Sequence, residues 1–366
     1  MNFFDEYNWD KYWDLYPEQE YDIDEYFKIL SPVFPDFLHK YTELKIMQRL
    51  KGVGLLCGTD WTKIYRNRFF YSRYQHSVAV ALIIWHFTKD KVQALAGLFH
   101  DIATTVFSHV SDFRKGDTLL QTATEEPTAE ILRNDQELKI LLQEDNINIE
   151  EIVDYHKYPV ADNEIPCLSA DRLEYMFPSG MALYGSWTMD EIRSTYNDIS
   201  VLKNESGVDE LGFNTVSIAE NYCFQFCMIG HILQLNENKL TLELLGQVMT
   251  EGVEQGVLQE EDFMTLSEKA VIDKIEIACK TNNENFKTLK KYYKTFREMT
   301  AVKHTDEPLE NHFCVKLKVK QRYINPLVKT QDGTKRLYDV SEKAKKIIDD
   351  FKAFEDTEYG CTEFVE

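Results

Sequence analysis

Apolar residues recur at helical spacing along most of the chain. Residues 41–50 are amphipathic, with apolar side chains three and four positions apart. Residues 72–88 are apolar on every side, a pattern that predicts a central, fully surrounded helix, and a second apolar helix follows over residues 91–102. Further helices are expected over residues 124–143, 146–155, 169–176, 188–204 and 215–300, the last with breaks near Asn236 and Gly252.

The last sixty residues show a different pattern. Phe313–Lys320 alternates apolar residues with Lys, which predicts a strand buried on one side. Asp332-Gly333 is a turn signal, residues 336–340 are a possible partner strand, and residues 341–351 read as a helix capped by Ser341. The predicted fold class is therefore mainly α, a helical bundle with a helical extension and a small α+β C-terminal section.

The organisation expected along the chain has four parts. They are an aromatic and acidic N-terminal segment (1–40), a core (41–200), a helical extension (201–305) and the α+β section (306–366). Residues 1–24 are compatible with a docking arm, and nothing in them suggests chemistry.

Composition narrows the class of protein. The chain has 366 residues, 43% of them hydrophobic and 13% aromatic, which favours a large buried core over disorder. The net charge of −21 disfavours a broad nucleic-acid surface, because phosphate binding needs clustered Lys and Arg. There is no apolar run long enough to span a membrane, and the acidic start does not resemble a secretory signal.

Cysteine usage indicates the redox compartment. The seven Cys are scattered, and no Cys-x-x-Cys occurs. Buried, reduced thiols are favoured over metal or disulfide use, and a cytoplasmic location is the corresponding expectation.

Four residues combine into a candidate metal site. His76 and the pair His100-Asp101 fall on two adjacent apolar helices, and Asp171 begins a third helix. Each has an ordinary explanation, a core His or a helix-capping Asp. A buried carboxylate without a partner is costly, however, and metal coordination removes that cost. Two imidazoles and two carboxylates suit one divalent Mn, Fe, Ni, Zn or Mg ion with positions left for water and substrate.

These segments resemble the HD-domain metal-dependent phosphohydrolase superfamily, whose motif is H…HD…D. The four ligands of that family map onto His76, His100, Asp101 and Asp171. The nearest likeness is to the dNTP triphosphohydrolase branch, the SAM- and HD-domain-like proteins. It is carried by Met47–Leu50, Arg73–Val78, Phe107-Ser108-His109 with Asp112, Asp171–Tyr175 and, more weakly, Val319–Val328. The resemblance implies an HD-domain bundle for residues 41–200 and a homo-oligomeric assembly.

Residues near the ligands are candidates for catalysis and substrate binding. His109 could protonate the leaving group, with Asp112 orienting or charging it. Arg73 lies one helical turn before His76 and could hold a phosphate. Arg172 and Tyr175 fall where the resembled family contacts phosphate, and His156 could reach the pocket from a loop. Ion-paired Arg, structural His and surface His remain the alternatives.

The chain departs from the resembled branch at several positions. Thr104 and Thr124 stand where the branch has His, Leu55 replaces a sugar-contacting Gln, and Pro178-Ser179 replaces an Arg-Asp pair. A metal-dependent phosphohydrolase acting on a nucleotide or related phosphate ester is therefore expected. The alternatives are a metal-containing nucleotide sensor with little or no turnover and, less favoured, an inactive scaffold.

One charged pattern has two interpretations. Lys316, Lys318, Lys320 and Arg322 form a positive stripe on an acidic protein. Lys residues on an edge strand discourage aggregation, and the alternative is a polyanion or nucleotide contact between subunits.

Overall fold

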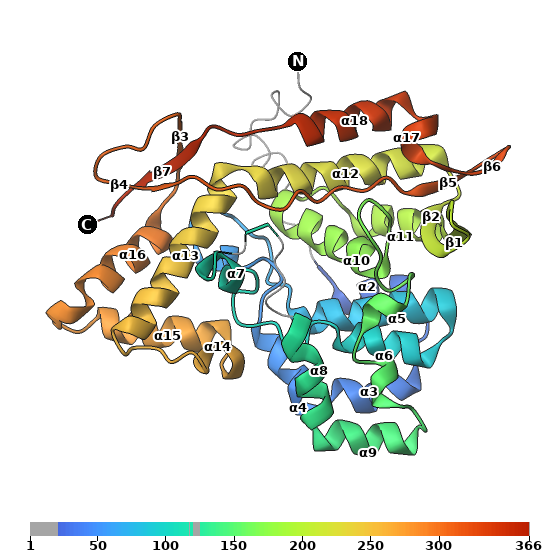
Figure 1. The fold of residues 1–366 in the computed structure, drawn as a ribbon, viewed down its shortest axis with the longest axis horizontal. Coiled ribbons are helices and arrows are strands. Elements are labelled where there is room, and N and C mark those ends of the chain that lie inside the picture. The colour runs from blue at the N-terminus through green and yellow to red at the C-terminus, as the bar shows by residue number, and fades with distance from the viewer. Residues whose placement is uncertain (1–20, 117, 120–124, 366) are drawn as a thin grey trace.

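The protein is described from a computed structural model, which covers residues 21–116, 118–119 and 125–365. The N-terminal half is a bundle of short helices around one long hairpin (Figure 1). Its helices are α2 (Ile23–Leu30), α3 (Asp36–Thr42), α4 (Lys45–Arg49), α5 (Arg73–Thr88), α6 (Lys91–Phe99), α7 (Val110–Arg114), α8 (Glu125–Asn134), α9 (Gln136–Glu144), α10 (Ala170–Ser179) and α11 (Met189–Asn197).

The hairpin of α5 and α6 forms the centre of this bundle. Ser72 starts α5 with a capping box to Gln75, and the Asp90 carboxylate accepts the first free N–H groups of α6. Almost every side chain between Ser77 and Ile84 is buried, as the all-round apolar pattern predicts. Gly97 lets the two helices approach closely, because a Cβ there would lie 2.2 Å from the Ile84 Cδ1 atom.

The C-terminal half adds a second apolar core. The long helices α12 (Val216–Gln234) and α13 (Asn236–Glu254) run in different directions from Leu235 (Figure 1). Helix α12 packs with the first core, whereas α13, α14 (Asp262–Thr265), α15 (Glu268–Cys279) and α16 (Lys287–Glu298) surround the second together with α7. Ile102 belongs to the first core, and Val106, Phe107, Val110 and Phe113 belong to the second, so the segment after α6 connects the two cores.

Two small sheets complete the fold. Strands β1 (Ile199–Lys203), β2 (Asp209–Phe213), β5 (Leu327–Thr330) and β6 (Gly333–Arg336) form one sheet in this order, with only the β2–β5 pair parallel. Strands β3 (Lys303–Thr305), β7 (Tyr359–Glu363) and β4 (His312–Val315) form an antiparallel sheet in the order β3-β7-β4. Helices α17 (Leu337–Val340) and α18 (Glu342–Ala353) lie between β6 and β7 and place α18 against α12.

The mainly helical fold class is confirmed, but sheet structure is not restricted to the C-terminal section. The break near Asn236, the turn at Asp332-Gly333 and the helix capped by Ser341 are present. Residues 199–203 were expected to continue a helix. They instead form β1, because all five residues pair antiparallel with β2. Residues 146–155 form two short 3₁₀ turns, Ile149–Glu151 and Tyr155–Lys157, rather than a helix.

Two predictions for the C-terminal section are also wrong. The strand expected over Phe313–Lys320 ends at Val315, where pairing with β7 stops at Gly360. Residues 337–340 are helical, and the partner of β5 is Gly333–Arg336 immediately after the turn. The rest of the Lys-rich segment runs without regular structure toward residues 322–326.

The expectation of reduced cysteines is wrong for one pair. Cys314 on β4 and Cys361 on β7 stand opposite each other in the sheet and form a disulfide. The other five Cys are free thiols, two of them, Cys223 and Cys227, buried in α12. Among the described residues, no helix combines the length and apolar character that crossing a bilayer demands.

Candidate metal centre and active-site cavity

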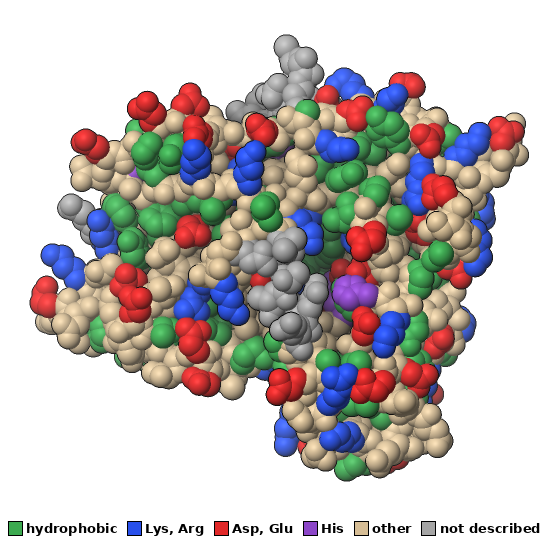
Figure 2. Space-filling model, in the orientation of Figure 1, with side chains coloured by type: hydrophobic (Ala, Val, Ile, Leu, Met, Phe, Trp, Pro, Cys, Tyr) green, Lys and Arg blue, Asp and Glu red, His purple; other side chains and the backbone are tan. Residues whose placement is uncertain are grey.

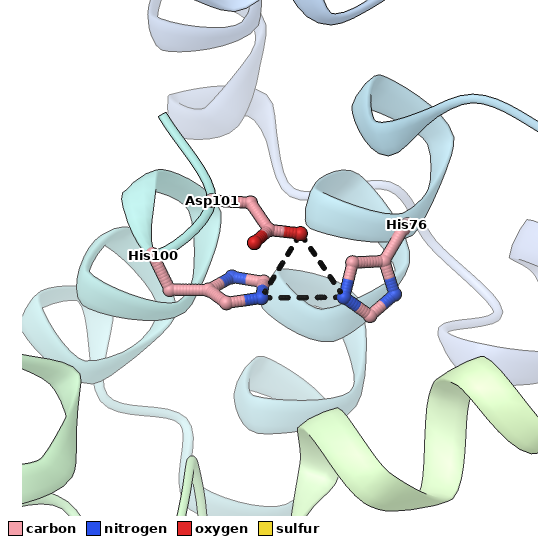
Figure 3. A group of neighbouring side chains, drawn as sticks. All are labelled: His76, His100 and Asp101. Atoms are coloured by element: carbon pink, nitrogen blue, oxygen red, sulfur yellow. Dashed lines mark hydrogen bonds and ion pairs between the residues drawn. The ribbon is translucent and has the colours of Figure 1, made fainter. Parts of the chain in front are cut away.

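The four predicted metal ligands come from three helices and converge on one point. His76 lies in the first turn of α5, His100-Asp101 directly follow α6, and Asp171 lies in the first turn of α10. Figure 3 shows the imidazoles of His76 and His100 facing each other beneath the Asp101 carboxylate. Because the cap of each helix fixes where its first turn begins, the α5–α6 hairpin and the start of α10 bring the four side chains together.

The spacing of the donor atoms fits a single cation. His76 Nε2 lies 3.2 Å from His100 Nε2 and 3.1 Å from Asp171 Oδ1. Asp101 Oδ2 lies 3.6 and 3.5 Å from the two Nε2 atoms, and Asp171 Oδ1 lies 3.6 Å from His100 Nε2. Ligands about 2.0–2.2 Å from one metal ion stand roughly 3–3.5 Å apart at right or tetrahedral angles. The donor set therefore fits a divalent ion.

The outer contacts of the two imidazoles strengthen this interpretation. His100 Nδ1 donates to the Gly97 carbonyl at 2.7 Å, and His76 Nδ1 is hydrogen-bonded to the Glu174 carboxylate. Each Nδ1 therefore carries a hydrogen, and the two Nε2 atoms face each other, with opposed lone pairs whenever both rings are neutral. Two lone pairs 3.2 Å apart repel unless a proton or a metal ion lies between them. Carbonyl and carboxylate partners of this kind typically orient metal-binding His.

Glu174 is the residue of this outer layer that the sequence analysis did not single out. It is fully buried, and its carboxylate also accepts hydrogen bonds from Tyr71 at 2.6 Å and Tyr26 at 3.1 Å. Its position three residues after Asp171 places it on the same side of α10, which is the only sequence signal for it.

Electrostatics favour a cation at this point. Burial lowers the pKa of His76, but the carboxylates of Glu174, Asp171 and Asp101 outweigh burial and raise it to about 10. Burial opposes ionisation of Asp101, yet the Arg73 guanidinium and the two His hold its pKa well below the usual range. The site thus carries ionised carboxylates, and a metal ion would compete with a proton for the imidazoles.

A cavity of about 1090 Å³ opens from the metal centre. Nine of the ten predicted site residues line it: His76, His100, Asp101, Asp171, Arg73, His109, Arg172, Tyr175 and His156. The tenth, Asp112, is buried behind His109. A hollow is visible near the middle of the face drawn in Figure 2, where Lys and Arg are interspersed with Asp and Glu on the visible described surface.

Arg73 and His109 form one wall of the cavity. Arg73 Nη1 donates to Asp101 Oδ2 at 2.6 Å, and its Nε donates to Ser108 Oγ at 3.1 Å. His109 Nδ1 donates to Asp112 Oδ2 at 2.9 Å, which leaves Nε2 toward Arg322 Nη2 at 3.5 Å. Burial lowers the pKa of His109, the Asp112 carboxylate raises it, and Arg322 and Arg73 lower it further.

Arg172, Tyr175 and His156 also lie at the cavity, and they differ in their hydrogen bonds and exposure. The Arg172 guanidinium donates to the Cys167 carbonyl at 2.9 Å and pairs with Asp162 at 3.2 Å, so it also fixes the loop before α10. Burial raises the pKa of Tyr175 to about 12. His156 is half exposed and its Nδ1 is 2.8 Å from Asp162 Oδ2. The roles assigned to all three remain predictions.

Several cavity residues come from segments that sequence reasoning treated separately. Lys320, Arg322 and Tyr323 reach the cavity from the segment after β4, and Phe226 and Ile229 from α12 form part of its apolar wall. The positive stripe is thus divided. Lys316 and Lys318 pair with Glu358 and Glu355 at the surface, while Lys320 and Arg322 line the cavity of the same chain.

The positions that depart from the resembled branch also lie here. Thr104 is buried, and its hydroxyl donates to Asp101 Oδ1 at 3.1 Å, so it orients a candidate metal ligand. Leu55 and Ser179 line the cavity. Thr124 lies outside the described residues.

Comparison with known proteins agrees with this site. Residues 73–176, which contain all four candidate ligands, match the model of the HD domain. An uncharacterized protein of Bacillus subtilis (strain 168), YdhJ, is 23% identical over 313 residues, covering 82% of this chain and 86% of that protein.

Solved structures show the same fold over nearly the whole chain. A phosphohydrolase from Bacteroides thetaiotaomicron VPI-5482 superposes with a TM-score of 0.62 at 14% identity, covering 91% of this chain and 97% of that one. A hypothetical protein from Aquifex aeolicus gives 0.59 at 15% identity, with 89% and 92% covered. Residues 73–176 therefore form an HD domain, and the four candidate ligands of the H…HD…D motif converge within it.

Proposed function

We propose that the protein hydrolyses a phosphate ester of a nucleotide or a related small molecule with the help of one divalent metal ion. His76, His100, Asp101 and Asp171 would hold the ion, whose identity among Mn, Fe, Ni, Zn and Mg is open. The single observation that carries the proposal is the pair of Nε2 atoms 3.2 Å apart, with both Nδ1 atoms hydrogen-bonded to acceptors.

The ion would supply a water of lowered pKa and polarise a phosphoryl oxygen. The residues around it divide the remaining work. Arg73, which is held by Asp101 and Ser108, presents a fixed positive charge for the phosphoryl group beside the metal centre. Arg322 adds a second positive charge near His109.

His109 is the proposed proton donor to the leaving oxygen. Asp112 fixes its Nδ1–H, so the proton is exchanged at Nε2 on the cavity side. Without substrate, burial and the two Arg keep the imidazole neutral. A bound phosphate beside Nε2 would favour the protonated form and make His109 an acid when substrate is present.

The experiment that tests this function is a substrate screen on metal-reconstituted protein. Nucleoside mono-, di- and triphosphates and simple phosphomonoesters are supplied with Mn, Fe, Ni, Zn or Mg, and released phosphate and triphosphate are measured. We expect at least one substrate to be hydrolysed, and His109→Gln to lower kcat by about 100-fold. Absence of release from every substrate and metal would overturn the proposal.

A second candidate function is nucleotide sensing with little turnover. Thr104 favours it, because this buried hydroxyl bonds a metal ligand at a position where the resembled branch has a proton-transferring His. A sensor would bind nucleotide in equilibrium dialysis, with a rise in thermal stability or a change in assembly, and release no product. The enzyme would consume the same nucleotide during the dialysis.

A further inference from the structure

One buried carboxylate joins the second apolar core to the wall of the active site. Glu268, the first residue of α15, is 1% exposed. Its Oε1 accepts the backbone N–H of Gly54 at 2.8 Å and of Phe107 at 3.2 Å, and its Oε2 accepts the Trp61 indole N–H at 2.8 Å. A side chain from the helical extension thus satisfies donors on two loops that belong to the cavity.

The first of these loops sets the start of α5. Leu55 N–H donates to the Tyr71 carbonyl, and Arg73 N–H donates to the Val53 carbonyl, each at 2.8 Å. Residues 53–55 therefore lie alongside residues 71–73 and fix the backbone from which the Arg73 side chain reaches Asp101. Glu268 holds the Gly54 N–H at the middle of this pairing.

The second loop carries Ser108 and His109. Phe107 and Ser108 have φ angles of 61° and 51°, a left-handed conformation that these residue types rarely adopt. Such a conformation persists only when the surroundings hold it in place. The hydrogen bond from Phe107 N–H to Glu268 is one such restraint.

The two loops meet at Ser108. Its hydroxyl donates to the Gly54 carbonyl at 2.9 Å and accepts from Arg73 Nε at 3.1 Å. A continuous set of hydrogen bonds therefore runs from Glu268 through Gly54 and Ser108 to Arg73 and on to Asp101.

We propose that Glu268 is a positioning residue for the phosphohydrolase reaction. By accepting from both loops with one oxygen, it fixes Arg73 and His109 relative to the metal centre, and it makes the helical extension a required part of the active site. Glu268 itself contacts neither the four ligands nor the cavity. The inference rests on the proposed function, and its test separates the two.

Three variants distinguish positioning from simple stabilisation. Glu268→Met has a similar volume and no acceptor, so the N–H groups of Gly54, Phe107 and Trp61 all lose their partner. Glu268→Gln keeps one carbonyl oxygen for Gly54 and Phe107 and loses the Trp61 contact. Trp61→Phe is the control, because it removes the indole donor to Oε2 and leaves the hydrogen bonds from Gly54 and Phe107 in place.

The first readout is kinetic, at about pH 8, since burial raises the pKa of Glu268 to about 7. We expect kcat of Glu268→Met to fall by about 10- to 100-fold, with metal content unchanged. Glu268→Gln and Trp61→Phe should retain kcat within about threefold. The positioning role would be overturned if the kcat of Glu268→Met stayed within twofold of wild type. It would also be overturned if all three variants lost kcat in proportion to their loss of thermal stability.

The second readout is amide hydrogen exchange of peptides covering residues 53–57 and 104–113, which requires no turnover. Glu268→Met should lose protection in both peptides, whereas Trp61→Phe should not. If wild-type protein hydrolyses nothing, the proposed function fails while this measurement still decides whether Glu268 fixes the loops. If Glu268→Met does not fold, Ser108→Ala breaks the same connection, and an unchanged kcat in that variant contradicts the proposal.

Discussion

The described part of the chain holds two clusters that combine His with carboxylates at metal-ligand spacing, and only one has the geometry of a metal site. In the first, ligand atoms of His76, His100 and Asp101 lie within 4.8 Å of one another. In the second, the same criterion is met by Glu237, His304 and Asp356. The residue types alone do not separate the two clusters.

The hydrogen bonds of the rings do separate them. His304 uses both nitrogens, with Nδ1 2.7 Å from Asp356 Oδ1 and Nε2 2.8 Å from Glu237 Oε1. The two carboxylates raise its pKa to about 10, and neighbouring carboxylates raise that of His76 to about the same value, so the pKa does not separate the clusters. Each nitrogen of His304 instead faces its own carboxylate, and neither is directed to a centre shared with a second imidazole. In the first cluster each ring uses Nδ1 for an outer acceptor and keeps Nε2 for the centre. The direction in which the Nε2 atoms point, rather than the number of ligand-type residues, favours the first cluster as the metal site.

The second cluster instead connects the small sheet to α13. His304 lies on β3, Glu237 is in the first turn of α13, and Asp356 Oδ2 accepts the Asn236 N–H at 2.7 Å. An ion pair that bridges two elements in this way is expected to contribute to stability.

The largest expected effect comes from removing a ligand of the first cluster. Asp101→Ala should abolish stoichiometric metal binding and lower phosphate release by at least about 10³-fold, because it removes a charged donor and the partner of Arg73. Metal per chain is measured by elemental analysis after dialysis. Asp356→Ala, the matched change in the second cluster, should keep the metal content of wild type. Equal metal loss in both variants would contradict the comparison.

A smaller effect is expected from the outer layer of the first cluster. Glu174→Gln keeps the volume and a carbonyl acceptor for His76 but removes the negative charge, and metal affinity should fall by about 10- to 100-fold. Competition with a fluorescent chelator measures the change. Glu237→Gln serves as the control in the second cluster and should leave metal affinity unaltered. An unchanged affinity in Glu174→Gln would show that the His76 orientation does not depend on this carboxylate.

The sequence predicted those features whose pattern lies in neighbouring residues, and it missed contacts between residues far apart in the chain. The central hairpin could be predicted from the apolar residues of 72–88 and 91–102. A helix that is buried on every side needs apolar residues at nearly every position, so the pattern is visible locally. Each of His76, His100, Asp101 and Asp171 alone would be an ordinary core or capping residue. Two imidazoles and two carboxylates together, with a consecutive His-Asp pair at the end of an apolar helix, predicted a metal site, and the family motif then supported the same four residues.

Other features had no local signal. Glu268 and Gly54 are 214 positions apart, and nothing near either one indicates their hydrogen bond. Arg322 was noticed in the positive stripe, which was interpreted as an edge strand or as a polyanion contact between subunits. Its place at the cavity could not be predicted, because the end of pairing with β7 at Gly360 is not visible in the local pattern. Residues 199–203 were read as helix because their partner strand was not recognised.

The smallest expected effect comes from His304 itself and concerns stability alone. The folded-state pKa of His304 lies above its unfolded value of roughly 6.5, so its ion pairs stabilise the protein fully below that pH and are lost as pH rises through about 10. His304→Gln should lower the free energy of unfolding by about 1 kcal/mol near pH 6, and the difference from wild type should shrink toward pH 10. Urea unfolding at several pH values measures this. Metal content and phosphate release should remain those of wild type, because both nitrogens of His304 are engaged by Asp356 and Glu237. If added Mn or Zn instead stabilised wild type and Asp101→Ala equally, and neither ion stabilised His304→Gln, the second cluster would be the metal site and the comparison would be reversed.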